Sequence, residues 1–164
     1  MKKVILTFEI YPFQIDFSGH VSNIVYVQWM EITRLKLLEE AGSSVQDMAA
    51  RLGVIPVLTD TQIHYRKALY FGDRVRAEAW VSELRPASAW VEYRFYNGAN
   101  ELAASGRQKG VYLYRDTLRP YRLTAEERAR LELYLQPEKG DSLVQSEADM
   151  RREAAPGRPP SSDP

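Results

Sequence analysis

The spacing of hydrophobic residues changes along the chain, from a helical pattern in the first third to an alternating pattern afterwards. Residues 24–41 are apolar on nearly every side in their first half, follow the favourable N-cap residues Ser22 and Asn23, and stop at Gly42, a favourable helix end. This pattern predicts one long helix that must be covered on most of its sides. A second, shorter helix is predicted over 45–52.

Alternation of apolar and polar residues with a period of two predicts several strands, because successive side chains of a strand point to opposite faces. Asn97-Gly98 is a strong signal for a hairpin turn between two of these strands. A last helix is predicted to begin at Thr124, where Glu127 completes a capping box. The predicted strands are 3–10, 61–65, 75–81, 89–95 and 102–114.

The order of these elements predicts the fold. One strand precedes the long helix, and four strands with short connections follow it, as in an antiparallel meander. A single sheet of five strands therefore has to wrap around one unusually buried helix. We expect an α+β protein with the hot-dog fold.

Composition indicates where the folded part ends. Beyond Leu135 the chain has no aromatic residue and holds five of its nine prolines. A segment with so little to bury cannot offset the entropy of ordering it. We therefore expect one domain over 1–135 and a disordered tail over 136–164.

Charge and residue types exclude several functions. Lys and Arg total 22, as do Asp and Glu, so the chain lacks the basic surplus that binds nucleic acids. No apolar run approaches the roughly 20 residues of a membrane span, and the absence of cysteine fits a reducing compartment, so we expect a cytoplasmic protein. With no cysteine and only two histidines, we expect neither a metal nor a cofactor, and any hydrolytic chemistry falls to a carboxylate.

The segment 15–34 has features of a catalytic site. Asp16 stands shortly before the long helix, and Gly19 permits a tight turn between them. The unpaired amides near Asn23 would lie at the positive end of the helix dipole. A carboxylate beside such amides suits attack on a carbonyl group, although a carboxylate near a helix start is also a common cap.

This segment resembles the active-site motif of the hot-dog enzymes of the 4-hydroxybenzoyl-CoA thioesterase family. The family pattern is approximately Asp-x-x-Gly-(His or Val)-Val-x-Asn, with a Tyr three residues on and a later Glu-x-x-Arg, and further likeness runs through 65–75. This chain departs from many members at Gln14, Ser22 and Ala68, where they have Asp, Asn and Pro. The matching residues are Asp16, Gly19, His20, Val21, Asn23, Tyr26, Glu31 and Arg34.

The resemblance implies a thioesterase that acts on an acyl-CoA or aroyl-CoA substrate. Asp16 would attack the thioester carbonyl or activate a water molecule, and the backbone amide of Asn23 would stabilise the oxyanion. Gly19 would form the turn between them. His20 would orient Asp16 or line the pocket, while a simple hydrogen bond within the turn explains it equally well.

Four further residues are candidates for substrate binding. Tyr26 matches the family pattern, and Glu31 is long enough to reach an acyl pocket, although it can also form a structural pair with Arg34. Arg66 and Lys67 follow a predicted strand and could contact the phosphates of CoA. A solvated basic pair also explains these two residues.

Other functions on this fold stay open at this point. They are a thioesterase acting on acyl carrier protein, an enoyl-thioester hydratase or dehydratase that uses His20 with Asp16, and a non-catalytic module that binds acyl thioesters. In the family that the chain resembles, two subunits join their sheets edge to edge. Because edge strands are normally protected, we expect a homodimer, and a homotetramer formed by two such dimers.

Overall fold

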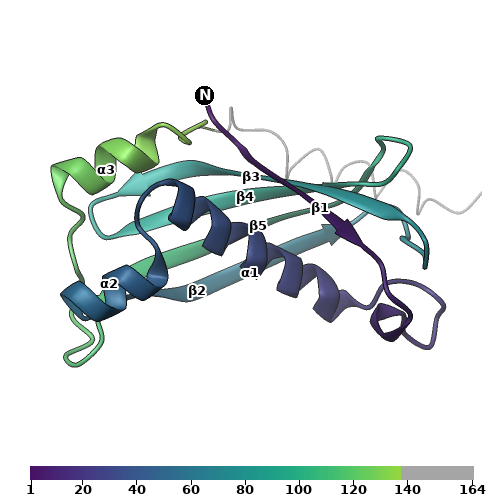
Figure 1. The fold of residues 1–164 in the computed structure, drawn as a ribbon, viewed down its shortest axis with the longest axis horizontal. Coiled ribbons are helices and arrows are strands. Elements are labelled where there is room, and N and C mark those ends of the chain that lie inside the picture. The colour runs from purple at the N-terminus through teal and green to yellow at the C-terminus, as the bar shows by residue number, and fades with distance from the viewer. Residues whose placement is uncertain (138–164) are drawn as a thin grey trace, which may run out of the picture.

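A computed structural model describes residues 1–137 and shows one antiparallel sheet of five strands with three α-helices in this part of the chain. Figure 1 shows the long helix α1 lying across one face of the sheet, with α2 and α3 at the same end of the molecule. The helices are α1 (Asn23–Glu40), α2 (Val45–Leu52) and α3 (Ala125–Glu132), preceded by one short 3-10 turn, η1 (Pro12–Gln14). The strands are β1 (Val4–Glu9), β2 (Val54–Tyr65), β3 (Arg74–Arg85), β4 (Ser88–Tyr96) and β5 (Leu102–Tyr114).

The helix α1 forms where the sequence predicts it and begins one residue earlier. Ser22 is its N-cap, with an extended backbone at φ −61° and ψ 144°. Gly42 follows its last turn with a φ of +67°, and the N–H of Ser43 donates to the carbonyl of Leu38 at 2.8 Å. Glycine adopts this φ without the strain that a side chain brings, so Gly42 ends the helix as predicted.

The strand order in the sheet is β1-β3-β4-β5-β2. Strands β3, β4 and β5 form a meander, but β2 pairs with β5 and not with β3, so the predicted meander of four consecutive strands is wrong for β2. The connection over 66–73 is longer than a tight hairpin and carries the chain across the end of the sheet. Strands β1 and β2 are consequently the two edges.

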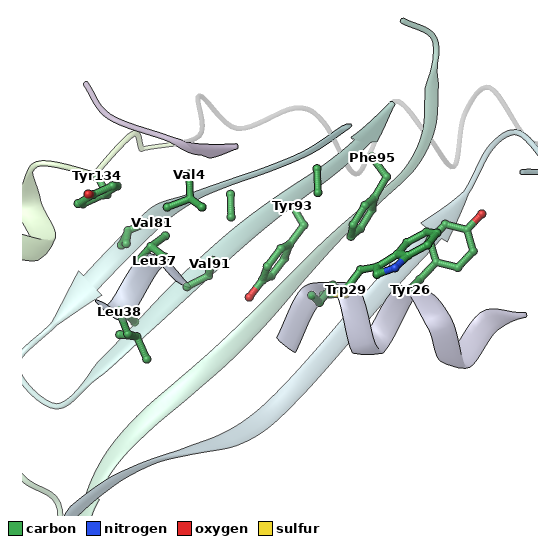
Figure 2. Close-up of a cluster of buried hydrophobic side chains, with 14 of the residues drawn as sticks. Val4, Tyr26, Trp29, Leu37, Leu38, Val81, Val91, Tyr93, Phe95 and Tyr134 are labelled. Atoms are coloured by element: carbon green, nitrogen blue, oxygen red, sulfur yellow. The ribbon is translucent and has the colours of Figure 1, made fainter. Parts of the chain in front are cut away.

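The core lies between α1 and the sheet. Figure 2 shows Tyr26 and Trp29 of α1 beside Phe95 of β4, and the ring centroids of Phe95 lie 5.8 Å from Tyr26 and 6.0 Å from Trp29. Phe8 of β1 stacks on Trp29 at 5.4 Å. Aromatic contacts of this kind add to the burial energy of the rings, so they fix the first turns of α1 against the sheet.

The opposite side of α1 is not covered by the described residues. The exposed fractions of Ile24, Val27, Ile32 and Leu35 are 63%, 38%, 47% and 36%. The expectation that the helix is covered on most sides therefore fails for residues 1–137 taken as one chain. An apolar helix surface of this kind is typical of an interface with another molecule.

The last described residues continue the fold. The N–H of Gln136 donates to the carbonyl of Val81 at 2.8 Å, and its side-chain amide donates to the carbonyl of Lys2 at 3.1 Å. Apart from these first two residues, Gln136 and Pro137, the predicted tail lies outside the described residues.

Candidate active site

A small hairpin carries Asp16 to the start of α1. Ile15 and Val21 form an antiparallel bridge, and the N–H of Asp16 donates to the carbonyl of His20 at 2.9 Å. Gly19 closes the hairpin with a φ of +80°, a conformation that glycine adopts at little steric cost. The sequence prediction of a tight turn at Gly19 is confirmed, and the structure brings Asp16, Gly19 and His20 together.

The Asp16 carboxylate is held within this hairpin by Ser18. One carboxylate oxygen accepts hydrogen bonds from the backbone N–H of Ser18 at 2.8 Å and from its hydroxyl. Both bonds lower the pKa of Asp16 below its usual value. The Ser18 hydroxyl contributes most and the Ser18 N–H comes second, and the His20 ring acts in the same direction. Asp16 is therefore an ionised, half-exposed carboxylate at neutral pH.

His20 approaches Asp16 through Ser18. Its Nδ1 lies 3.2 Å from the Ser18 hydroxyl oxygen, and its ring packs edge-on against Tyr70 with centroids 5.2 Å apart. Ser18 thus links the carboxylate to the imidazole, a role that the sequence analysis missed. The signal was present, because an Asp that accepts a hydrogen bond from the residue two positions later forms a recognisable turn.

The first turn of α1 lacks the side-chain cap that the other two helices have. The Ser44 and Thr124 side chains accept hydrogen bonds from the first turns of α2 and α3, whereas the Ser22 side chain makes no such bond. The N–H of Ser22 donates to the carbonyl of Gln14 at 2.9 Å, which ties the hairpin to the helix start. Asn23, an exposed residue, follows as the first residue of α1, and its backbone amide lies at the positive end of the helix dipole.

Tyr26 lies mainly in the core. It is 3% exposed, and its ring contacts Tyr65 of β2 edge-on at a centroid distance of 5.1 Å. Burial raises the pKa of Tyr26 to about 12, so the phenol is neutral. The contact with Tyr65 places the end of β2 beside the start of α1.

Glu31 lies on α1 two turns beyond Asn23, on the exposed side. Its Oε1 is 3.2 Å from Nη2 of Arg34, and the Glu31 side chain is 52% exposed. The predicted pair between Glu31 and Arg34 is confirmed. Arg34 is much more deeply buried than Glu31: the residue as a whole is only 8% exposed.

Arg66 and Lys67 are exposed residues that directly follow β2. Both of their N–H groups donate to the carbonyl of Ala103, at 2.8 and 3.0 Å, and the Lys67 ammonium is 2.5 Å from a carboxylate oxygen of Glu101. The N–H of Val21 donates to the carbonyl of Leu69 in the same connection at 2.9 Å. The segment after β2 therefore lies next to the Asp16 hairpin, with part of its positive charge neutralised by Glu101.

The described residues form neither a metal-binding cluster nor a membrane-spanning helix. Within 1–137 no three His, Asp or Glu side chains group closely enough to hold a metal ion. No helix in this part of the chain is both long and apolar enough to cross a membrane.

A five-stranded antiparallel sheet packed on one long helix is the architecture of the hot-dog thioesterases. The model of the thioesterase-like superfamily matches residues 12–157, and the chain belongs to this superfamily. The match extends into the segment predicted as a tail. It confirms the prediction of a hot-dog thioesterase made from the residues around Asp16.

Individual relatives agree with this assignment. YneP of Bacillus subtilis (strain 168), which carries the provisional name acyl-CoA thioesterase, is 27% identical over 105 residues, or 64% of this chain and 75% of YneP. The DHNA-CoA thioesterase from Staphylococcus aureus has a crystal structure with a TM-score of 0.70 and 25% identity, covering 94% of this chain and 93% of that one. A 1,4-dihydroxy-2-naphthoyl-CoA thioesterase from Synechocystis shares the fold, with a TM-score of 0.72 and 14% identity over 79% of this chain and 96% of its own.

Proposed function

We propose that this protein hydrolyses an acyl-CoA or aroyl-CoA thioester to the free acid and CoA. The observation that carries the proposal is the pairing of an ionised Asp16 with a helix start whose amides have no side-chain cap. The names of YneP and of the Staphylococcus aureus enzyme support the choice of a CoA thioester. The proposal also accounts for the absence of a thiol nucleophile from the chain.

In the proposed reaction Asp16 acts on the thioester carbonyl carbon, either directly or by taking a proton from a water molecule that attacks it. The carbonyl electron pair moves to oxygen, and the resulting oxyanion accepts a hydrogen bond from the Asn23 N–H. Collapse of this tetrahedral species breaks the carbon–sulfur bond and releases CoA as the thiolate, which is then protonated. If Asp16 is the nucleophile, water cleaves the mixed anhydride and restores the carboxylate.

Around this centre, His20 orients the Ser18 hydroxyl that is hydrogen-bonded to Asp16, and Gly19 permits the tight turn of the hairpin. Tyr26 forms the wall where α1 meets β2, and Glu31 lies further along the same helix as a lining residue of the acyl site. Arg66 and Lys67 are proposed contacts for CoA phosphates. Because Lys67 already pairs with Glu101, Arg66 is the stronger of the two.

We further propose that the active unit is a homodimer in the cytoplasm, and that two dimers form a tetramer. The edge strand β2 ends beside the start of α1, through the contact between Tyr65 and Tyr26. A partner strand paired with this edge would complete the site, and the exposed apolar side of α1 offers a further surface to cover. Light scattering on the purified protein should give at least twice the chain mass of 18.9 kDa, and an active monomer would contradict this part of the proposal.

The activity is tested by following release of free thiol from a panel of CoA thioesters, with short-chain, long-chain and aromatic acyl groups, and from one acylated carrier protein. Turnover of CoA thioesters supports the proposal. Turnover of the carrier-protein substrate alone would assign the protein to the other thioesterase class. Addition of water to an enoyl-CoA without thiol release would indicate a hydratase, and binding without any reaction would indicate a non-catalytic module.

A further inference from the structure

Arg34 carries a buried positive charge that the described residues satisfy only in part. Its Nη2 contacts Glu31 at 3.2 Å, but its Nε and Nη1 are buried without a hydrogen-bond partner among these residues. Together these two nitrogens hold three of the five N–H donors of the guanidinium. No other side chain in the described part of the chain leaves two buried nitrogens in this state. Buried donors without acceptors destabilise a fold, so an acceptor supplied by a bound molecule would stabilise Arg34.

Several polar side chains lie in the interior of the domain near Arg34. Burial raises the pKa of Tyr93 of β4 and of Tyr112 of β5, and the nearby positive charge of Arg34 acts in the opposite direction on both. The Tyr93 hydroxyl donates to Oε1 of Gln108 at 3.0 Å, and Nε2 of Gln108 donates to the Thr61 hydroxyl at 3.4 Å. A chain of polar groups therefore runs from the middle of the sheet to the edge strand β2.

There is open space on the same face of the sheet. An added Cβ at Gly106 of β5 would meet Met30 of α1 at 3.1 Å, so Gly106 faces the helix. Gly110 lies four residues on in a regular stretch of the β4–β5 ladder, and therefore on the same face. An added Cβ at Gly110 would have no atom within 4 Å, and Gly110 is partly exposed. We call the open space above Gly110, beside the paired residues Gln108 and Thr61 on the helix-facing side of the sheet, the polar recess.

The polar recess lies at a distance from the reaction centre that an acyl group can span. Side chains on a helix lean toward its N-terminus, and Nη2 of Arg34 contacts Glu31 one turn earlier. The guanidinium is therefore about two turns, or roughly 11 Å, along α1 from the amides near Asn23. An extended acyl chain of about eight carbons, or a bicyclic aromatic group with a substituent, covers most of this length.

On the basis of the proposed thioesterase function, we propose that Arg34 determines specificity by binding a hydrogen-bond-accepting oxygen at the far end of the acyl group. A guanidinium can only donate, so the matching group is a carboxylate, keto or hydroxyl oxygen, and a carboxylate gains most from the charge. The half-exposed Glu31 side chain covers Arg34 in the free protein. Its rotation into solvent gives the substrate oxygen access to the guanidinium.

The test compares substrates that differ only in this oxygen. One pair is octanoyl-CoA and 7-carboxyheptanoyl-CoA, and the other is 2-naphthoyl-CoA and 6-hydroxy-2-naphthoyl-CoA. The wild-type kcat/KM should favour the oxygenated member of at least one pair by about tenfold or more, the effect of one hydrogen bond to a charged donor. In Arg34→Met this ratio should fall by about tenfold.

Two further variants make the result specific to the polar recess. Gly110→Val fills the space while leaving Arg34 in place, and it should lower the same ratio even if Arg34→Met does not fold. Arg130→Met is the matched control, because Arg130 also has a buried, unpartnered Nε but lies on α3, and it should leave the ratio unchanged.

Several outcomes would overturn the inference. The first is a wild-type kcat/KM ratio near one in both substrate pairs, and the second is a ratio in folded Arg34→Met equal to that of the wild type. The third is an Arg34→Met variant in which only the mass measured by light scattering changes, because the free donors would then bind a partner subunit. Each of these leaves thioester hydrolysis intact. Failure of the proposed function looks different, because the wild type would then release thiol from none of the CoA thioesters.

Discussion

The carboxylate of Asp16 accepts two hydrogen bonds from a single residue, Ser18: one from its backbone N–H at 2.8 Å and one from its hydroxyl. The first bond holds the turn, and the second connects the carboxylate to His20. Both favour the ionised form of Asp16. The same two residues therefore determine the shape of the hairpin and the charge of the group proposed to attack the substrate.

Asp16→Asn should separate these two roles. An asparagine oxygen can still accept from the Ser18 N–H, so the hairpin and the thermal stability should be retained. The side chain can no longer act as nucleophile or base, and kcat should fall by about two to four orders of magnitude. Steady-state hydrolysis and a melting curve measure the two effects. Asp47→Asn is the control, since Asp47 is an exposed carboxylate at the start of α2, and it should retain full activity. Normal turnover by a folded Asp16→Asn variant would refute the role of Asp16.

Ser18→Ala should change the pH dependence of the reaction. The Ser18 hydroxyl is the largest cause that lowers the pKa of Asp16, so its removal raises that pKa. Because Asp16 must be ionised to react, the acidic limb of the kcat/KM profile should move to higher pH. Ser18→Thr keeps a hydroxyl at the same position and should restore the wild-type profile. An unchanged acidic limb in Ser18→Ala would mean that another group controls it.

Local signals in the sequence predicted most of the elements. The short helix α2 spans Val45–Leu52 as expected, because Ser44 and Gly53 mark its two ends. Thr124 and Glu127 form the expected capping box at the start of α3. These signals are reliable because each one satisfies backbone groups within a few residues of itself.

Relationships between distant segments were harder to predict. Nothing in the alternation of β2 indicates that it pairs with β5, because strand periodicity defines the two faces of a strand and not its neighbours. The pairing of Lys67 with Glu101 follows from that register and was missed for the same reason. Tyr26 was expected to bind substrate. Its burial against Tyr65 could not be predicted, because it depends on the position of β2 in the sheet.

The two glycines on the helix-facing side of β5 should respond differently to alanine. A Cβ at Gly106 would lie 2.9 Å from the carbonyl oxygen of Gln62 and 3.1 Å from Met30, so Gly106→Ala should lower the free energy of unfolding by about 1–3 kcal/mol. Gly110→Ala meets no atom within 4 Å and removes backbone freedom from the unfolded chain, so its stability should be equal or slightly higher. Urea denaturation of both variants measures the difference. Equal losses would show that the space beside Gly110 is not open.

The backbone amide of Asn23 can be removed without removing the helix. Asn23 is the first residue of α1, a position that proline favours because its N–H is not needed by the helix. Ser22 has the extended backbone, at φ −61° and ψ 144°, that the residue before a proline requires. Asn23→Pro should therefore fold with nearly unchanged stability while losing the proposed oxyanion donor.

Loss of one such donor should lower kcat by about 10²–10³-fold, with a smaller effect on KM, because the oxyanion forms only after the substrate is bound. Asn23→Ala keeps the N–H and removes only the side chain, so it should retain most of the activity. This pair of variants separates the amide from the side chain at one position. If Asn23→Ala is as inactive as Asn23→Pro, the side chain matters instead, and if both are active, the oxyanion is stabilised elsewhere.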